Sequence, residues 1–390
     1  MNQPRTSVKF DKKSFDRIKK ALGNLSYTRK RTCGVATLKL PAEIGLQLTN
    51  RCNLRCAHCF QWNKDGHHQQ MPKEWQDREL PFNLVEKVFA ETTSAQSGLF
   101  LWGGEPMFYS HWDELTKLLE LDPRWTVNCT NGILIEKKLD SLLRCSKTMV
   151  MLISVEGLGP VNDALRGKKS FEEIMKGINT LLNLKRKGVF KGEVSINCTI
   201  HEGNIDSLYE IVSYFEELKV NTIYLNFPWY LSSAVADSMD EHFAEHYKYL
   251  HHNKTASYAS WHGYCFHLPP QRVDQLEEEL HRIRTRKWDI RVRLQPALES
   301  NEVRDFVIGE RTTMDQRSYC AGMHTRMDVM SSGRVSTCKL FPEFEIGSLK
   351  DKNVSDLWLG GDFSRFRETH EKTGLMPICS KCIVLHLQGL

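Results

Sequence analysis

Long apolar runs are missing from this chain of 390 residues, and residues 1–11 lack the apolar core of a signal peptide. These absences argue against a membrane protein and predict a cytoplasmic one. Aromatic residues do not interleave with basic ones in a known nucleic-acid motif, so we expect neither a membrane nor a nucleic-acid partner. A hydrophobic content of 41% and a charged content of 26% are typical of a globular protein.

The net charge is low, +5, but it is unevenly distributed. Residues 1–31 hold ten Lys or Arg against two Asp. A basic arm of this kind can meet an acidic leader peptide, a phosphorylated substrate or nucleic acid, and it is more often the solvated face of a helix, predicted here over residues 14–25. The arm is too short for a peptide-recognition domain, which favours a small-molecule substrate.

Three of the twelve cysteines, Cys52, Cys56 and Cys59, stand within eight residues directly after a strand-like run, 43–48. Thiolates so close in sequence can converge on one soft metal centre. An iron-sulfur cube takes four ligands, so three cysteines leave one iron open. A zinc site is the alternative, but zinc normally closes with a nearby fourth ligand and His58 is badly placed for that. Cysteines at metal-like spacings also predict a reducing compartment.

This stretch, with the aromatic Phe60 after its third cysteine, resembles the cluster loop of the radical S-adenosylmethionine (SAM) enzymes. In that family SAM chelates the open iron of a [4Fe-4S] cluster, and an electron from the cluster generates a 5′-deoxyadenosyl radical that takes a hydrogen atom from the substrate. The resemblance implies that Cys52, Cys56 and Cys59 are cluster ligands and that Phe60 lies beside the adenine. It also implies an external electron donor such as flavodoxin or ferredoxin.

Apolar strand-like runs alternate with helix-like segments as far as residue 227, which predicts a parallel sheet with right-handed crossovers. We expect strands at 99–102, 125–129, 149–155, 193–200 and 222–226, and helices near 83–92, 112–119, 134–143, 171–185 and 205–218. Six such units make a partial (β/α)6 TIM-type barrel, which is also the fold of the family resembled. The predicted fold class is therefore α/β, with active-site residues at the carboxyl ends of the strands.

Further matches to the family fall at those strand ends. Gly103, Gly104, Glu105 and Pro106 resemble the segment that receives the SAM amino group, and paired glycines let a backbone approach a ligand closely. Ser154 and Glu156 resemble residues that bind the SAM ribose and amino acid, Arg166 resembles an arginine near the SAM carboxylate, and Asn197 is a further ribose candidate. Thr130-Asn131-Gly132 is a weaker match, and without the resemblance it is a turn.

A second cysteine set lies near the carboxyl terminus: Cys320, Cys338, Cys379 and Cys382. Four thiolates are enough to close a complete cluster, and zinc is the alternative. The hairpin from Gly333 to Cys338 resembles the short "twitch" form of the SPASM extension behind many radical SAM barrels. The resemblance implies one auxiliary [4Fe-4S] cluster. The predicted organisation is a basic arm (1–42), the barrel (43–227), a helical bridging region (228–305) and a twitch/SPASM-like domain (306–390).

The bridging region is the least readable part. Its aromatic and histidine-rich loop, 261–267, is a candidate substrate contact or a packed surface loop, and no acidic partner supports a metal there. Helices are expected over 239–249 and 270–286. Of the remaining cysteines, Cys129, Cys145 and Cys198 are expected in the core, while Cys129 and Cys265 are also candidate hydrogen-atom donors.

An auxiliary cluster that accepts an electron favours net oxidation. The predicted function is therefore a radical SAM oxidoreductase that dehydrogenates or cross-links a small metabolite such as a sugar, polyol or aminocyclitol. Two alternatives stay open: a maturase that oxidises or cross-links a ribosomally made peptide, and a noncatalytic iron-sulfur or zinc sensor or scaffold.

Overall fold

A computed structural model of the chain describes residues 3–9, 11–12, 15–16, 18–20, 22, 37–250, 259–309, 311–315, 317–338 and 341–389. The helix expected at 14–25 falls largely, and Cys33 falls entirely, outside these residues. Among the described helices, none combines the length and the apolarity that crossing a bilayer requires.

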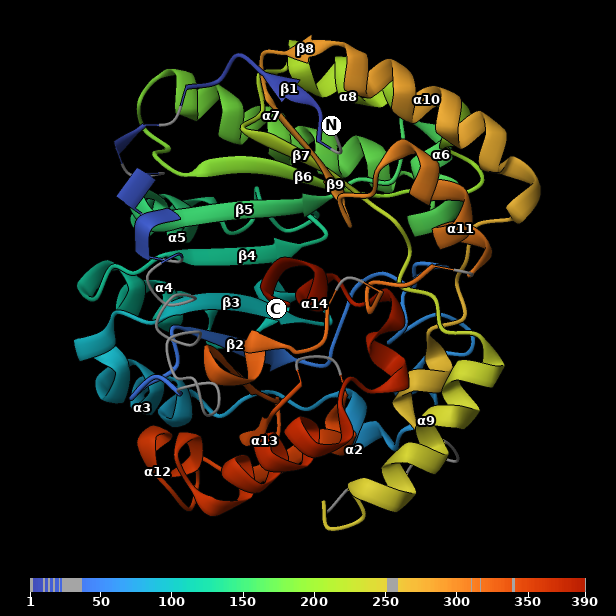
Figure 1. Cartoon of the computed structure of the whole chain (residues 1–390). Coiled ribbons are helices and arrows are strands. Elements are labelled where there is room, and N and C mark those ends of the chain that lie inside the picture. Colours follow the sequence, from blue (N-terminus) through green and yellow to red (C-terminus); the bar gives the residue numbers. More distant parts are fainter. Residues whose placement is uncertain are drawn as a thin grey trace.

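A ten-stranded sheet organises the fold, in the order β12-β11-β10-β2-β3-β4-β5-β6-β7-β9 (Figure 1). All its pairings from β10 through β2 to β9 are parallel, and only the β10-β11-β12 meander is antiparallel. The six barrel strands are β2 (Glu43–Thr49), β3 (Gly98–Gly103), β4 (Thr126–Thr130), β5 (Met149–Ser154), β6 (Glu193–Thr199) and β7 (Thr222–Asn226). The predicted α/β class and parallel barrel are confirmed.

The helices between these strands bury one apolar face against the sheet, as their 3.6-residue periodicity predicts. They are α3 (Phe82–Thr92), α4 (Trp112–Leu121), α5 (Leu139–Arg144), α6 (Pro160–Arg166), α7 (Ser170–Arg186) and α8 (Leu208–Glu217). Their buried residues join those of the strands in one continuous core. The helix expected over 134–143 forms only from Leu139 onward.

Strands from the other predicted regions extend the sheet at both edges. In the bridging region, β9 (Arg291–Gln295) pairs with β7 and extends the sheet, whereas β8 (Lys287–Trp288) forms a separate two-stranded sheet with β1 (Arg5–Thr6). In the carboxyl-terminal region, β10 (Arg326–Val329) pairs with β2 and leads into β11 (Arg334–Ser336) and β12 (Glu345–Ser348). The bridging region is therefore not only helical. The late cysteines are carried by a segment whose strands continue the barrel sheet.

The remaining helices surround the sheet (Figure 1). The bridging region contributes α9 (Ser233–His246), α10 (Val273–Thr285) and α11 (Val303–Ile308); the carboxyl-terminal region contributes α12 (Val354–Trp358), α13 (Gly361–Thr373) and α14 (Ile383–Gln388); a short α2 (Lys73–Gln76) follows the first cysteine loop. α9 packs against the 3₁₀ helix η11 (Pro377–Lys381). This contact joins the bridging region to the segment that carries Cys379.

Candidate active site at the carboxyl edge of the sheet

The first cysteine loop leaves β2 at the carboxyl edge of the sheet. The Cys59 N–H donates to the Cys56 carbonyl (3.1 Å), and the Ala57 N–H donates to the Leu165 carbonyl at the end of α6 (2.9 Å). The Leu54 N–H approaches the Cys52 sulfur at 3.4 Å. Backbone contacts thus fix the loop from within and anchor it to α6, the helix that follows the fourth barrel strand, β5.

The three thiols of this loop affect one another. Burial raises the pKa of Cys52 to about 12, with Glu105, Cys59 and Cys56 adding to the effect. Burial also raises the pKa of Cys56 to about 11, and Cys59 adds to it. Three soft donors held together in a desolvated place suit a metal centre, which would replace their protons. The residues present therefore fit a cluster with three thiolate ligands.

Gly103 and Gly104 press against this loop. A Cβ on Gly104 would lie 2.2 Å from the Arg51 carbonyl oxygen, and one on Gly103, whose φ is 149°, would lie 2.3 Å from that of Thr49. The Gly104 and Glu105 N–H groups donate to those same two oxygens, each across 2.8 Å. These glycines therefore permit a close backbone approach, and it is the cysteine loop of the protein itself that makes it.

Glu105 ties three strand ends together. It is fully buried and accepts hydrogen bonds from the Thr130 hydroxyl (2.7 Å) and the Asn131 N–H (2.7 Å). Asn131 in turn donates to Asn53 (2.8 Å) and points its amide at the Cys52 sulfur (3.8 Å). Asn131, only a weak match in the sequence, is a direct neighbour of a predicted ligand. Pro106, also buried, begins the 3₁₀ turn that follows.

Glu156 and Arg166 form a buried ion pair, Oε1 to Nη1, at 2.9 Å. His58, from the cysteine loop, lies 3.4 Å from the same carboxylate oxygen, and the Thr199 N–H donates to the other oxygen (2.6 Å). Burial would raise the pKa of Glu156, but His58 and Arg166 outweigh it and lower that pKa to about 2. Although the sequence excluded His58 as a ligand, it gave no sign that His58 would pair with Glu156.

The predicted ribose contacts lie side by side. Ser154 and Asn197 are register partners on β5 and β6, and both are half-buried. Asn226, at the end of β7, donates to the Asn197 side-chain oxygen across 2.8 Å. Because parallel strands end at one edge, these polar groups face the same side as the cysteine loop.

The four late cysteines also come together. Burial raises the pKa of Cys379 well above its usual range, and the thiols of Cys382, Cys320 and Cys338 raise it further. Cys382 begins α14, where its sulfur accepts from the Leu385 N–H at 3.3 Å. Cys320, which is separated from Cys379 by more than fifty residues, joins the group only through the tertiary fold. The donor set fits a fully ligated four-thiolate centre.

The aromatic loop of the bridging region lies between the two cysteine sets. Tyr264 is 2% exposed, and its ring stacks on Phe60 with centroids 4.6 Å apart. On the other side it packs against Phe341 (5.3 Å), three residues after Cys338. The sequence placed this loop near substrate or on the surface. The structure buries Trp261 and Tyr264, leaves Cys265 and His267 exposed, and leaves Cys129 half-buried.

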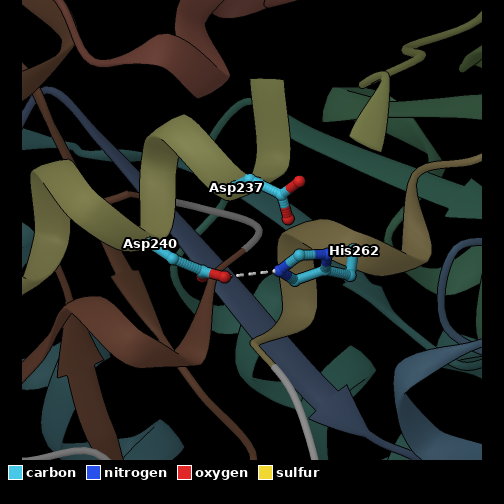
Figure 2. Close-up of side chains that lie close together, drawn as sticks. All are labelled: Asp237, Asp240 and His262. Atoms are coloured by element: carbon cyan, nitrogen blue, oxygen red, sulfur yellow. Dashed lines mark hydrogen bonds and ion pairs between the residues drawn. The ribbon is translucent and has the colours of Figure 1, made fainter. Parts of the chain in front are cut away.

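Two carboxylates hold this loop. Asp240 of α9 accepts from the Trp261 indole N–H and pairs with His262 Nε2, each at 2.8 Å (Figure 2). Glu343, from the carboxyl-terminal region, accepts from the Ser260 N–H and hydroxyl, each at 2.6 Å. The acidic partner that the sequence did not show is therefore Asp240. Asp237 also lies near His262, but the tether is made by Asp240, whose two oxygens engage Trp261 and His262.

The fold and the two cysteine sets define an α/β protein built to hold two soft-metal centres. Residues 46–225 match the radical SAM superfamily, and residues 320–383 match the SPASM iron-sulfur cluster-binding domain. The chain therefore contains a radical SAM domain and, near its carboxyl terminus, a SPASM domain. These domains imply a SAM-binding [4Fe-4S] cluster and an auxiliary cluster.

Similar proteins differ in what they act on. Pre-heme d1 synthase of Dinoroseobacter shibae is 30% identical over 46% of this chain and 41% of its own length. Mycofactocin maturase MftC of Mycolicibacterium smegmatis is 29% identical over 45% of this chain and 42% of its own length. The chain thus spans less than half of these two relatives. The AdoMet-dependent heme synthase of Methanosarcina barkeri is 23% identical over 88% of this chain and 90% of its own length.

Among solved structures, SuiB of Streptococcus suis bound to its precursor peptide SuiA has a similar fold, with a TM-score of 0.59. The two are 16% identical, and the match covers 96% of this chain and 77% of SuiB. The similarity therefore includes the bridging and carboxyl-terminal regions as well as the barrel.

Proposed function

We propose that the chain is a radical SAM maturase that oxidatively modifies a ribosomally made peptide. One observation carries the proposal: a loop of three converging thiols at the carboxyl edge of the sheet faces a second, four-thiol set across a buried aromatic layer. The names of MftC and of the SuiB–SuiA complex favour a peptide substrate. The preference for a sugar, polyol or aminocyclitol, which followed from the short amino-terminal arm, has no comparable support.

In this proposal Cys52, Cys56 and Cys59 hold the SAM-binding cluster, and Cys320, Cys338, Cys379 and Cys382 hold the auxiliary cluster. When bound, a reduced cluster supplies the electron that splits SAM into methionine and a 5′-deoxyadenosyl radical. The backbone of Gly103, Gly104 and Pro106 and the side chains of Ser154 and Asn197 receive SAM, and the Phe60 ring lies beside its adenine.

The buried carboxylates act mainly through other residues. Glu105 has no exposed atom and orients Asn131 and the glycine pair. Arg166 and Glu156 neutralise each other and hold the end of the cysteine loop by way of His58. The packed loop 260–264 excludes water from the space between the two cysteine sets.

Anaerobically purified protein tests the enzyme proposal. We expect about eight iron atoms per chain, as two [4Fe-4S] clusters require, and 5′-deoxyadenosine after reduction with SAM. The triple variant Cys52→Ala, Cys56→Ala, Cys59→Ala should form none while keeping about four irons. Persistent SAM cleavage in that variant would refute the assignment. Four irons without cleavage in the unaltered protein would support a sensor instead.

Co-expression with short peptides encoded beside the gene tests the substrate. A maturase should lower the mass of one of them by two hydrogen atoms or a multiple of two. The second candidate, oxidation of a tetrapyrrole, is favoured by the heme synthase match along most of the chain. It would be supported if iron-coproporphyrin accelerated 5′-deoxyadenosine formation while no peptide changed mass.

A further inference from the structure

Tyr264 occupies the junction between the two cysteine sets. Its ring is stacked on Phe60, the residue after Cys59, at an interplanar angle of 14°. Phe341 and Trp229 pack around it, with centroids 5.3 and 5.5 Å away, and the Leu231 N–H donates to its carbonyl (2.8 Å). With the Asp240 and Glu343 tethers close by, the ring has little freedom to move.

The Tyr264 hydroxyl is buried and has no hydrogen-bond partner among the residues that the structure describes. A buried hydroxyl without a partner has lost its bonds to water and is destabilising. Such a group calls for an acceptor that the protein chain alone does not provide. Glu343, whose two oxygens accept from Ser260, does not accept from this hydroxyl.

Thiols of both cysteine sets lie near this ring, and Phe341, which packs on it, follows Cys338 by three residues. Burial raises the pKa of Tyr264 well above its usual range, so the hydroxyl keeps its proton and can donate. Among the groups that raise this pKa further, Cys338 is the strongest, followed by Glu343 and Cys382, and Cys59 is the weakest. Two of the three thiols, including the strongest, belong to the late set.

We propose that Tyr264 is a positioning residue that donates a hydrogen bond to a sulfur of the auxiliary centre, at its Cys338 corner, and thereby sets the reduction potential of that centre. A hydrogen bond to sulfur delocalises charge from the reduced cluster and makes reduction easier. The inference depends on the proposed assignment of Cys320, Cys338, Cys379 and Cys382 as cluster ligands. It does not require SAM cleavage.

The experiment uses protein loaded with iron and sulfide in the Cys52→Ala, Cys56→Ala, Cys59→Ala background, so that only the auxiliary centre is present. Redox titration followed by EPR should give a lower reduction potential for Tyr264→Phe than for its parent. Hyperfine spectra of the reduced centre, taken in H₂O and in D₂O, should lose one exchangeable proton coupling in the same variant. Failure of SAM cleavage in the complete enzyme would leave both readouts intact.

Tyr109→Phe is the matched control. Tyr109 is equally buried at 1% exposure, but its hydroxyl already has an acceptor, the Leu80 carbonyl (2.6 Å). This control should leave the potential and the proton coupling unchanged. The proposal is overturned if Tyr264→Phe titrates at the parental potential, if both Tyr→Phe variants shift equally, or if the late cysteines contain zinc or no iron.

Discussion

Arg166 donates from Nη1 to Oε1 of Glu156 across 2.9 Å, and both side chains are at most 5% exposed. The pair lies beneath the first cysteine loop, to which His58 connects it. Two charges of opposite sign in a dry place stabilise one another, but each is costly when left alone. This relationship leads to the first prediction.

Arg166→Met should lower the free energy of unfolding by about 3–5 kcal/mol, because it leaves the Glu156 charge buried without its guanidinium partner. Adding Glu156→Gln should restore part of the loss. Chemical denaturation of the two single variants and the double variant measures the coupling. If the double variant is no more stable than Arg166→Met, the two side chains do not act as a pair.

The same pair predicts a pH dependence. The folded pKa of Glu156, about 2, lies below its ordinary value of 4.5. Its contribution is therefore complete above about pH 4.5 and is lost as the pH falls toward 2. Acid titration of unfolding should show a shallower loss for Glu156→Gln than for the unaltered protein over that interval. Parallel curves would contradict this.

Glu345 predicts the opposite pH dependence: near neutrality, stability should fall as the pH rises. Burial raises its pKa to about 7, against the lowering effect of Arg334. A raised carboxyl pKa means that stability is complete below pH 4.5 and falls as the pH rises to 7, by about 3 kcal/mol at 1.4 kcal/mol per pKa unit. Glu345→Gln should flatten this fall between pH 5 and 8, measured by denaturant titration. The exposed Glu278→Gln is the control and should leave the slope unchanged.

Gly104→Ala should displace the first cysteine loop, because its Cβ would lie 2.2 Å from the Arg51 oxygen. Overpacking of this kind costs about 1–3 kcal/mol, and we also expect loss of iron from the amino-terminal site. Gly98→Ala, at the start of the same strand, meets nothing nearer than 3.5 Å and should keep its iron. Iron analysis and chemical denaturation of both variants test this prediction. Equal iron in the two would show that the glycine packing is not needed.

Asp240→Asn should loosen the loop that carries Tyr264, because it weakens the bonds to Trp261 and His262. We expect a loss of about 1–3 kcal/mol and faster amide exchange over residues 259–268. Asp237→Asn, three residues earlier on α9 and exposed, should change little. An equal effect of both substitutions, reversed by added zinc, would instead make the trio a cation site.

The sequence by itself determined the barrel and both cysteine sets. Strand–helix alternation, the spacing of Cys52, Cys56 and Cys59, and the late Cys379 and Cys382 pair are local patterns, and local patterns can be read from a chain. The same holds for Cys145 and Cys198, which lie in the core as expected. The family resemblance then supplied the cofactors.

Only the tertiary structure decided how these parts meet. β10 pairs with β2, from which more than 270 residues separate it. Asp240 and Glu343, from two different regions, bind the same loop. Tyr264 lies near thiols from both ends of the chain. Such contacts depend on burial and on the packing of distant segments. Periodicity and spacing along the sequence carry no record of them.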